Sequence, residues 1–124
     1  SGETIRGTVG GHVTAAAGND EFYVTQELQV PAPVPITDAN VIVDGNYENT
    51  TICQGGYANP TAPPGRLCVY DSLGANVGTN SDEEEGTGAG GIGGPASPYG
   101  FALRFYSLAA GDVSVFATWA YTAP

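Results

Sequence analysis

The last quarter of the chain, residues 99–122 (YGFALRFYSLAAGDVSVFATWAYT), carries the pattern that most restricts the fold. Apolar side chains occupy the odd positions on both sides of a central turn segment: Tyr99, Phe101, Leu103, Phe105, Val113, Val115, Ala117, Trp119 and Tyr121. A period of two places such residues on one face of a β-strand. Gly111 gives the segment Ser107–Asp112 the backbone freedom of a tight turn. The pattern predicts a β-hairpin whose odd face is buried in the core.

The even face of this predicted hairpin is partly apolar as well, because Tyr106 and Phe116 lie there beside Arg104. A hairpin that is apolar on both faces is covered twice, either within its own domain or by a second chain. Burying one large apolar side chain is worth about 1.5–3 kcal/mol. We therefore predict that Tyr106 and Phe116, together with Tyr23, form a contact between subunits that pack about one axis.

The composition favours a single all-β domain that spans residues 1–124. Nineteen Gly and nine Pro indicate many turns and little helix. The net charge of −10, with only three Arg and no Lys, argues against nucleic acid and anionic membrane surfaces as partners. No apolar run reaches the 18 residues that a membrane-spanning helix needs, so no membrane insertion is expected.

Alternating or short apolar segments, separated by Gly, Pro and Asn turns, predict strands in the rest of the chain. The candidates are Thr4–Val9, His12–Ala17, Glu21–Val30, Val41–Val43, Arg66–Tyr70 and Leu73–Val77. Seven to nine short strands without helical periodicity predict an antiparallel β-sandwich of the jelly-roll kind. Residues 78–98 are Gly-rich and acidic, and we expect them to form a long loop without regular structure.

The two cysteines, Cys53 and Cys68, flank a loop rich in Pro and Gly. An even count without other metal ligands favours one disulfide and an oxidising, extracellular compartment, whereas two buried thiols are the alternative. In the chain-entropy model a loop of this length is stabilised by about 3 kcal/mol.

Four adjacent carboxylates, Asp82, Glu83, Glu84 and Glu85, form the most concentrated polar feature. Such a run is stable when it is solvated or when a cation lies among the carboxylates. The first case is an ordinary loop tip, and the second is a Ca²⁺ site. The spacing of an EF-hand loop is absent, and no other cofactor is expected.

No catalytic signature is present in the sequence, so the chain is not expected to be an enzyme. His12 is the one histidine and has no nucleophile motif beside it. Tyr47 and Tyr57 lie in or beside loops, where an exposed ring can stack on a sugar. The alternative is that both are ordinary half-buried loop tyrosines.

Three segments resemble the C-terminal globular domain of bacterial collagen-like proteins: IRGTVGG (residues 5–11), NPTAPPGRLCVY (residues 59–70) and SPYGFALRF followed by ATWAYTAP (residues 97–124). The resemblance implies a C1q/TNF-like jelly roll that trimerises, closes a collagen triple helix and catalyses no reaction. Two features depart from the family pattern. The sequence includes no Gly-X-Y repeat before Ser1, and residues 78–98 look like an individual insertion.

The expected function is therefore that of a non-enzymatic, secreted or cell-surface structural domain. It would form a homotrimer, cap a collagen-like or other fibrous surface protein, and display a distal recognition surface for a glycan or protein ligand. Two alternatives remain open. One is a carbohydrate- or Ca²⁺-dependent binding or adhesion module, and the other is a virion decoration or fibre-head protein.

Overall fold

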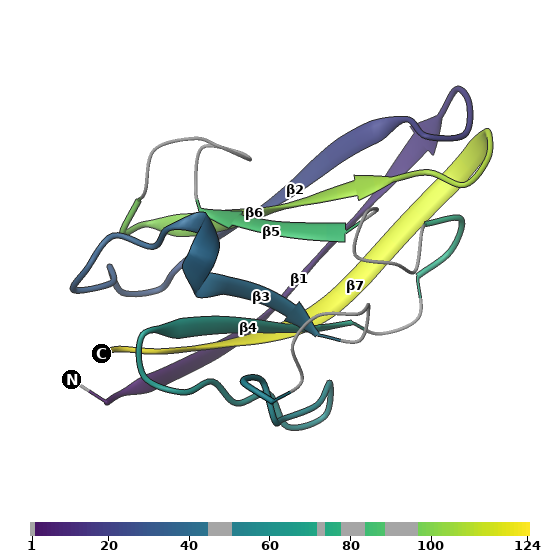
Figure 1. The fold of residues 1–124 in the computed structure, drawn as a ribbon. Helices are drawn as coiled ribbons and strands as arrows, with labels where there is room; N and C mark the ends of the chain where they lie inside the picture. The colour runs from purple at the N-terminus through teal and green to yellow at the C-terminus, as the bar shows by residue number, and fades with distance from the viewer. Residues whose placement is uncertain (1, 45–50, 72–73, 78–83, 89–96) are drawn as a thin grey trace.

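The computed structural model describes residues 2–44, 51–71, 74–77, 84–88 and 97–124. They form an all-β fold of two sheets, without an α-helix in the described parts of the chain (Figure 1). The first sheet has the order β1-β7-β4-β3, with strands Thr4–Ala15, Gly111–Thr122, Arg66–Asp71 and Val41–Asp44. The second sheet has the order β2-β6-β5, with strands Glu21–Glu27, Gly100–Tyr106 and Glu84–Gly88. A turn of 3₁₀ helix, η1 (Asp38–Asn40), leads into β3.

Antiparallel pairing dominates both sheets. β1 pairs with β7 along its whole length, from Thr4 opposite Thr122 to Ala15 opposite Gly111. β2 pairs with β6 and β6 with β5, also antiparallel, whereas β3 and β4 run parallel at the edge of the first sheet. The predicted all-β, mainly antiparallel fold is therefore confirmed, with one parallel pair that the sequence did not predict.

The core lies between the two sheets, and the odd positions of β6 and β7 line it together with residues of β1, β3 and β4. Trp119 of β7 is 0% exposed, and its ring meets that of Phe101 of β6 edge-on, with 5.5 Å between the ring centroids. Phe105 of β6 stacks on Phe22 of β2 at 5.7 Å. The predicted burial of the odd face is confirmed for these strands, with Tyr99 as an exposed exception before β6 begins.

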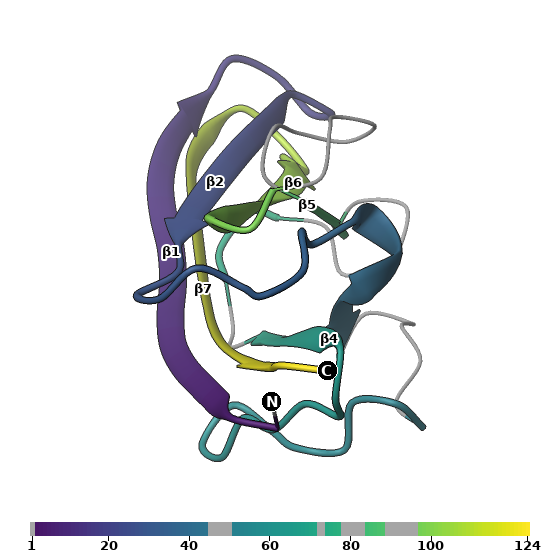
Figure 2. The ribbon, with the colours of Figure 1, turned by 90° about the vertical axis from the view of Figure 1, so that its left-hand side faces the viewer.

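The predicted hairpin between these two strands is wrong. β6 and β7 belong to different sheets, and the segment between them is a corner that passes from one sheet to the other. The alternation indicated correctly which side chains are buried, but it carries no information about which strand is the hydrogen-bonding partner. Figure 2 shows the strands of the two sheets on either side of the core. The odd side chains of β6 and β7 meet in that core, so their even side chains point to opposite outer faces of the molecule.

Several other strand boundaries differ from expectation. β1 continues through Gly10-Gly11, where the sequence predicts a break, because its pairing with β7 is uninterrupted. β2 ends at Glu27 instead of Val30. β5 lies inside residues 78–98, for which no regular structure is expected; a run of Glu and Gly gives no strand signal, yet its backbone pairs with β6.

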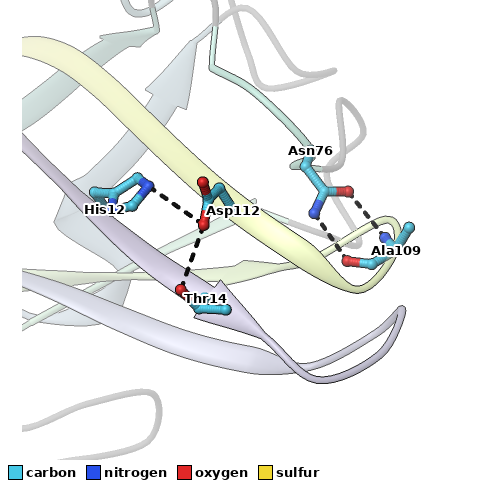
Figure 3. A network of polar contacts seen from close by, with 5 residues as sticks. All are labelled: His12, Thr14, Asn76, Ala109 and Asp112. Atoms are coloured by element: carbon cyan, nitrogen blue, oxygen red, sulfur yellow. Dashed lines mark hydrogen bonds and ion pairs between the residues drawn. The ribbon is translucent and has the colours of Figure 1, made fainter.

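The corner between β6 and β7 is fixed by hydrogen bonds to two other segments. Ser107, 1% exposed, donates from its hydroxyl to the carbonyl of Ala17 at 2.5 Å and accepts from the backbone N–H of Asp20 at 3.0 Å. On the other side, the Asn76 side chain donates to the carbonyl of Ala109 at 2.8 Å and accepts from its N–H at 2.9 Å (Figure 3). These contacts hold the end of the fold where both sheets turn.

Candidate functional site

Phe116 is the main apolar feature on the outer face of the first sheet. It lies on β7 opposite Gly10 of β1, and 55% of its surface is exposed. A Cβ atom at Gly10 would come within 3.1 Å of the Phe116 Cδ1 atom. The ring therefore lies against a strand position without a side chain, which makes this part of the face flat and apolar.

The strand beside Phe116 presents no carboxylate on this face. The outward positions of β1 are Thr4, Arg6, Thr8, Gly10, His12 and Thr14. Asp112 of β7 is the acidic neighbour at the end of the strand, 3.9 Å from the Nε2 atom of His12 and 3.4 Å from the Thr14 hydroxyl that donates to it (Figure 3). His12 and Asp112 are both largely exposed, so this contact contributes little to stability.

The outer face of the second sheet carries a different group of side chains, centred on Glu21 of β2. Its carboxylate accepts a hydrogen bond from the hydroxyl of Tyr23 at 3.1 Å and another from the hydroxyl of Tyr106 at 3.0 Å. Arg104 lies 3.8 Å from the same carboxylate, and its guanidinium is 5.3 Å from the Tyr106 ring centroid. One carboxylate thus orients two tyrosine rings, and a cation lies over one of them.

The three residues predicted at a subunit contact lie on two faces. Tyr23 and Tyr106 are on the outer face of the second sheet, whereas Phe116 is on the outer face of the first. Because these faces point in opposite directions, one contact about a single axis does not contain all three side chains. A contact between subunits stays a prediction, and its three candidate residues belong to two separate surfaces.

The disulfide between Cys53 and Cys68 is present, with Cα atoms 5.8 Å apart, which confirms the predicted pairing. Its loop folds over the outer side of the first sheet and forms a small second core with Ile42 and Tyr70. The Tyr70 hydroxyl donates to the carbonyl of Thr61 at 2.5 Å and accepts from the N–H of Gly55 at 2.9 Å.

The same loop is attached to the two long strands. Arg6 of β1 donates to the carbonyl of Pro60 at 2.7 Å, and Thr118 of β7 donates to the carbonyl of Tyr57 at 2.8 Å. The Tyr57 ring is exposed, as a sugar-stacking role requires. Tyr47, the other tyrosine considered for that role, lies outside the described residues.

The predicted Ca²⁺ site falls mostly outside the described part of the chain. Asp82 and Glu83 lie outside it, and Glu84 and Glu85 are the first residues of β5. Within the described residues, no group of three or more His, Cys, Asp or Glu side chains could hold a metal ion. The Ca²⁺ hypothesis stays a prediction that concerns the acidic run alone.

The hollows on the described surface include the following two. The larger, about 620 Å³, lies along the disulfide loop and is lined by Thr51, Ile52, Gln54, Thr61, Ala62, Pro63, Pro64 and Arg66. The smaller, about 260 Å³, is lined by Val34, Pro35, Ile36, Asn40, Gly65, Tyr121 and Pro124. Sequence reasoning missed the smaller one, because its lining comes from three segments that are far apart in the chain.

The described residues contain no helix that is long and apolar enough to cross a membrane. No family model, no curated protein and no solved structure matches this chain. The function is therefore argued from the geometry of the two outer faces and from the residues that carry the resemblance described above.

Proposed function

We propose that this chain is a non-enzymatic, extracellular assembly domain. It forms a homotrimer, caps a collagen-like or other fibrous surface protein and displays a recognition surface away from the axis. The trimeric state and the fibrous context come from the resemblance of three sequence segments to the C-terminal domains of bacterial collagen-like proteins. The disulfide fits an oxidising compartment, as a secreted or surface location requires.

The observation that carries the proposal is the exposed ring of Phe116 over Gly10. A large aromatic side chain on a flat strand surface is the kind of anchor that protein interfaces bury at their centre. Charge also selects this face. In a chain of net charge −10, like charges oppose self-association, and the outward positions of β1 beside Phe116 are free of carboxylates.

The proposed trimer therefore brings three copies of the Phe116 face together about one axis. A contact between Phe116 of one subunit and the Tyr23–Tyr106 face of the next is a poorer solution. Two opposite faces that meet head to tail tend to build an open stack instead of a closed ring. The Tyr23–Tyr106 face then remains available as the displayed surface.

The strand pairing supports a jelly roll as the finer description of the fold. The first strand pairs with the last in one sheet, and the second pairs with the penultimate in the other. This nesting of strand pairs across two sheets is the arrangement of a jelly roll. The parallel strand β3 at the edge departs from the usual antiparallel pattern.

The native mass in solution tests the proposal. Light scattering should give about three times the chain mass of 12.6 kDa, and Phe116→Asp should give monomers, because a carboxylate would be buried at the axis. Leu108→Asp is the matched control, since Leu108 is equally exposed but lies in the corner between β6 and β7. A wild-type monomer, or an unchanged trimer of Phe116→Asp, contradicts the proposal.

A carbohydrate-binding or Ca²⁺-dependent adhesion module is the second candidate. The paired tyrosines held by Glu21 favour it, because oriented and partly exposed rings beside polar groups suit a sugar. A glycan array with the wild type and with Tyr23→Ala tests it, and repetition in EDTA separates the Ca²⁺-dependent form. Binding that Tyr23→Ala leaves unchanged would exclude this face.

The coding sequence upstream distinguishes a collagen-like stalk, with Gly-X-Y triplets, from a virion protein.

A further inference from the structure

The 260 Å³ hollow lies at the end of the fold where residues 34–40, Gly65, Tyr121 and Pro124 come together. Its apolar wall comes from Val34, Pro35, Ile36 and Pro124, and Tyr121 adds an aromatic ring. A water molecule takes about 30 Å³ of the liquid, so the hollow has room for about nine non-hydrogen atoms. It is concave and mostly apolar, with few polar groups, which is the usual character of a small-molecule site.

Tyr121 is the buried polar residue of this hollow. Only 5% of its surface is exposed, and no hydrogen bond joins its hydroxyl to another described residue. Burial raises the pKa of Tyr121 above its ordinary value of 10.0, so the hydroxyl keeps its proton at neutral pH. The hydroxyl oxygen itself is open to solvent at the hollow, so a ligand oxygen would replace a water molecule as its hydrogen-bond partner.

Asn40 supplies a second donor to the same hollow. Its side-chain oxygen is engaged by Thr37, accepting from the backbone N–H at 3.2 Å and from the hydroxyl at 2.8 Å. The amide nitrogen of Asn40 makes no hydrogen bond with the described residues. Both polar side chains that line the hollow can therefore donate, and one acceptor oxygen on a ligand can use both of them.

The lining also specifies the charge of the ligand. None of the seven lining side chains is ionised at neutral pH, so a charged group would lose its hydration without gaining a side-chain counter-ion. The net charge of −10 adds a repulsion against anions. A carbonyl oxygen on an uncharged molecule accepts from both donors and brings no charge. A tertiary amide supplies such an oxygen and has no N–H group of its own that would need an acceptor.

We propose that this hollow is a binding site for an uncharged, apolar group that carries a carbonyl oxygen, of which an N-acylated pyrrolidine is the simplest form. The carbonyl oxygen accepts hydrogen bonds from Tyr121 and Asn40, and the ring packs on Val34, Pro35 and Ile36. A proline residue of a peptide and a free small amide share this chemistry. The site is separate from both outer faces and does not depend on the assembly proposed above.

The probe is 1-acetylpyrrolidine, which has eight non-hydrogen atoms and no N–H group. Titration followed by ¹H–¹⁵N NMR should shift the Asn40 side-chain amide and the backbone amides of residues 36 and 65 in a saturable way. A ligand of this size binds with Kd in the millimolar range. Cyclopentanecarboxylate has the same number of non-hydrogen atoms and a five-membered ring but a negative charge, and it should bind at least tenfold more weakly.

Two variants test the donors. Tyr121→Phe keeps the ring and removes only the hydroxyl, and Asn40→Asp keeps an oxygen for Thr37 and removes the amide N–H groups. Each should raise Kd for 1-acetylpyrrolidine about three- to tenfold, which is the effect of one lost hydrogen bond. Tyr99→Phe, at an exposed residue outside the hollow, should leave Kd unchanged. Near-ultraviolet circular dichroism of Trp119 checks that each variant is folded.

The outcomes decide the proposal. It is overturned if no saturable shift occurs at residues 36, 40 and 65, if the carboxylate binds as well as the amide, or if both donor variants bind like the wild type. It is supported if the amide binds and either folded variant weakens that binding. Tighter binding of acetyl-Ala-Pro-Ala-amide than of 1-acetylpyrrolidine then assigns the ligand to a peptide, and weaker binding assigns it to a free small molecule.

Discussion

The indole of Trp119 occupies the space that a side chain at Gly7 would need. The two residues are paired across β1 and β7, and a Cβ atom at Gly7 would lie 2.7 Å from the Trp119 Cζ2 atom and 2.9 Å from Cε2. The indole N–H donates to the carbonyl of Thr8 at 3.3 Å, which fixes the ring beside β1. The largest side chain of the core is therefore matched to a strand position without a side chain.

Gly7→Ala should lower the free energy of unfolding by about 1–3 kcal/mol, because the buried indole has no room to move. Alanine also restricts the unfolded chain more than glycine does, which favours folding, but this gain is smaller than the loss from the clash. Urea unfolding followed by Trp119 fluorescence measures the change. Gly56→Ala is the control, since a Cβ atom at Gly56 would have no other atom within 4 Å. If Gly7→Ala and Gly56→Ala lower the free energy of unfolding equally, Trp119 does not pack on Gly7 as described.

Ser107→Ala should cost about 1–3 kcal/mol, because it leaves the Ala17 carbonyl and the Asp20 N–H without their hydroxyl partner in a buried corner. Ser114→Ala is the matched control, because no hydrogen bond of its side chain to a described residue is present. Thermal unfolding of both variants gives the comparison. A melting temperature of Ser107→Ala equal to that of the control would show that the corner is not held by this hydroxyl.

Removal of the disulfide should destabilise the fold by about 3 kcal/mol, the value for a loop closed over a sequence separation of 15 residues. The double variant Cys53→Ser/Cys68→Ser and the wild type in reducing agent should show the same lowered urea midpoint. Reducing agent should leave the double variant unchanged. If the wild type keeps its midpoint on verified reduction, the loop is held by the Tyr70 contacts alone.

Stability should fall as the pH rises above 10, in part because of Tyr121. Burial raises the pKa of this residue in the folded state, so the unfolded chain loses the proton first and gains from ionisation. The contribution is complete below pH 10 and is lost as the pH rises through the folded-state pKa. Urea unfolding between pH 8 and 11.5 should show a shallower decline for Tyr121→Phe than for the wild type. If the free energy of unfolding falls equally with pH in the wild type and in Tyr121→Phe, Tyr121 does not cause the decline.

The alternation of β6 and β7 is sufficient to predict the core but not the topology. Phe101 and Trp119 are predicted to share a buried face, and they do meet, but across the core from two sheets. The period of the side chains indicates which face of a strand is buried, whereas the pairing of the strands depends on segments up to 118 residues away. The same limit explains why Gly10-Gly11 resembles a break: the pairing with β7 overrides the weak strand propensity of Gly.

The candidate sites are predictable to different degrees. The Cys53–Cys68 pair follows from cysteine count alone, and exposure of Phe116 follows from its even position in an otherwise odd apolar pattern. The opposite placement of Tyr106 and Phe116 depends on the sheet to which each strand belongs. The pairing of Asn40 with Tyr121 in one hollow depends on where η1 meets the end of β7, for which the sequence holds no local signal.

The pairing of β1 with β7 also sets the order in which this protein acquires its structure. The hydroxyls of Thr4 and Thr122 meet at 2.7 Å across a sequence separation of 118 residues. At a synthesis rate of about 5–20 residues per second, β1 waits roughly 6–24 s on the ribosome for its partner to be made. The first sheet is thus completed only after translation reaches the last strand, and the high contact order of this pairing makes folding slow compared with that of helical domains of equal length.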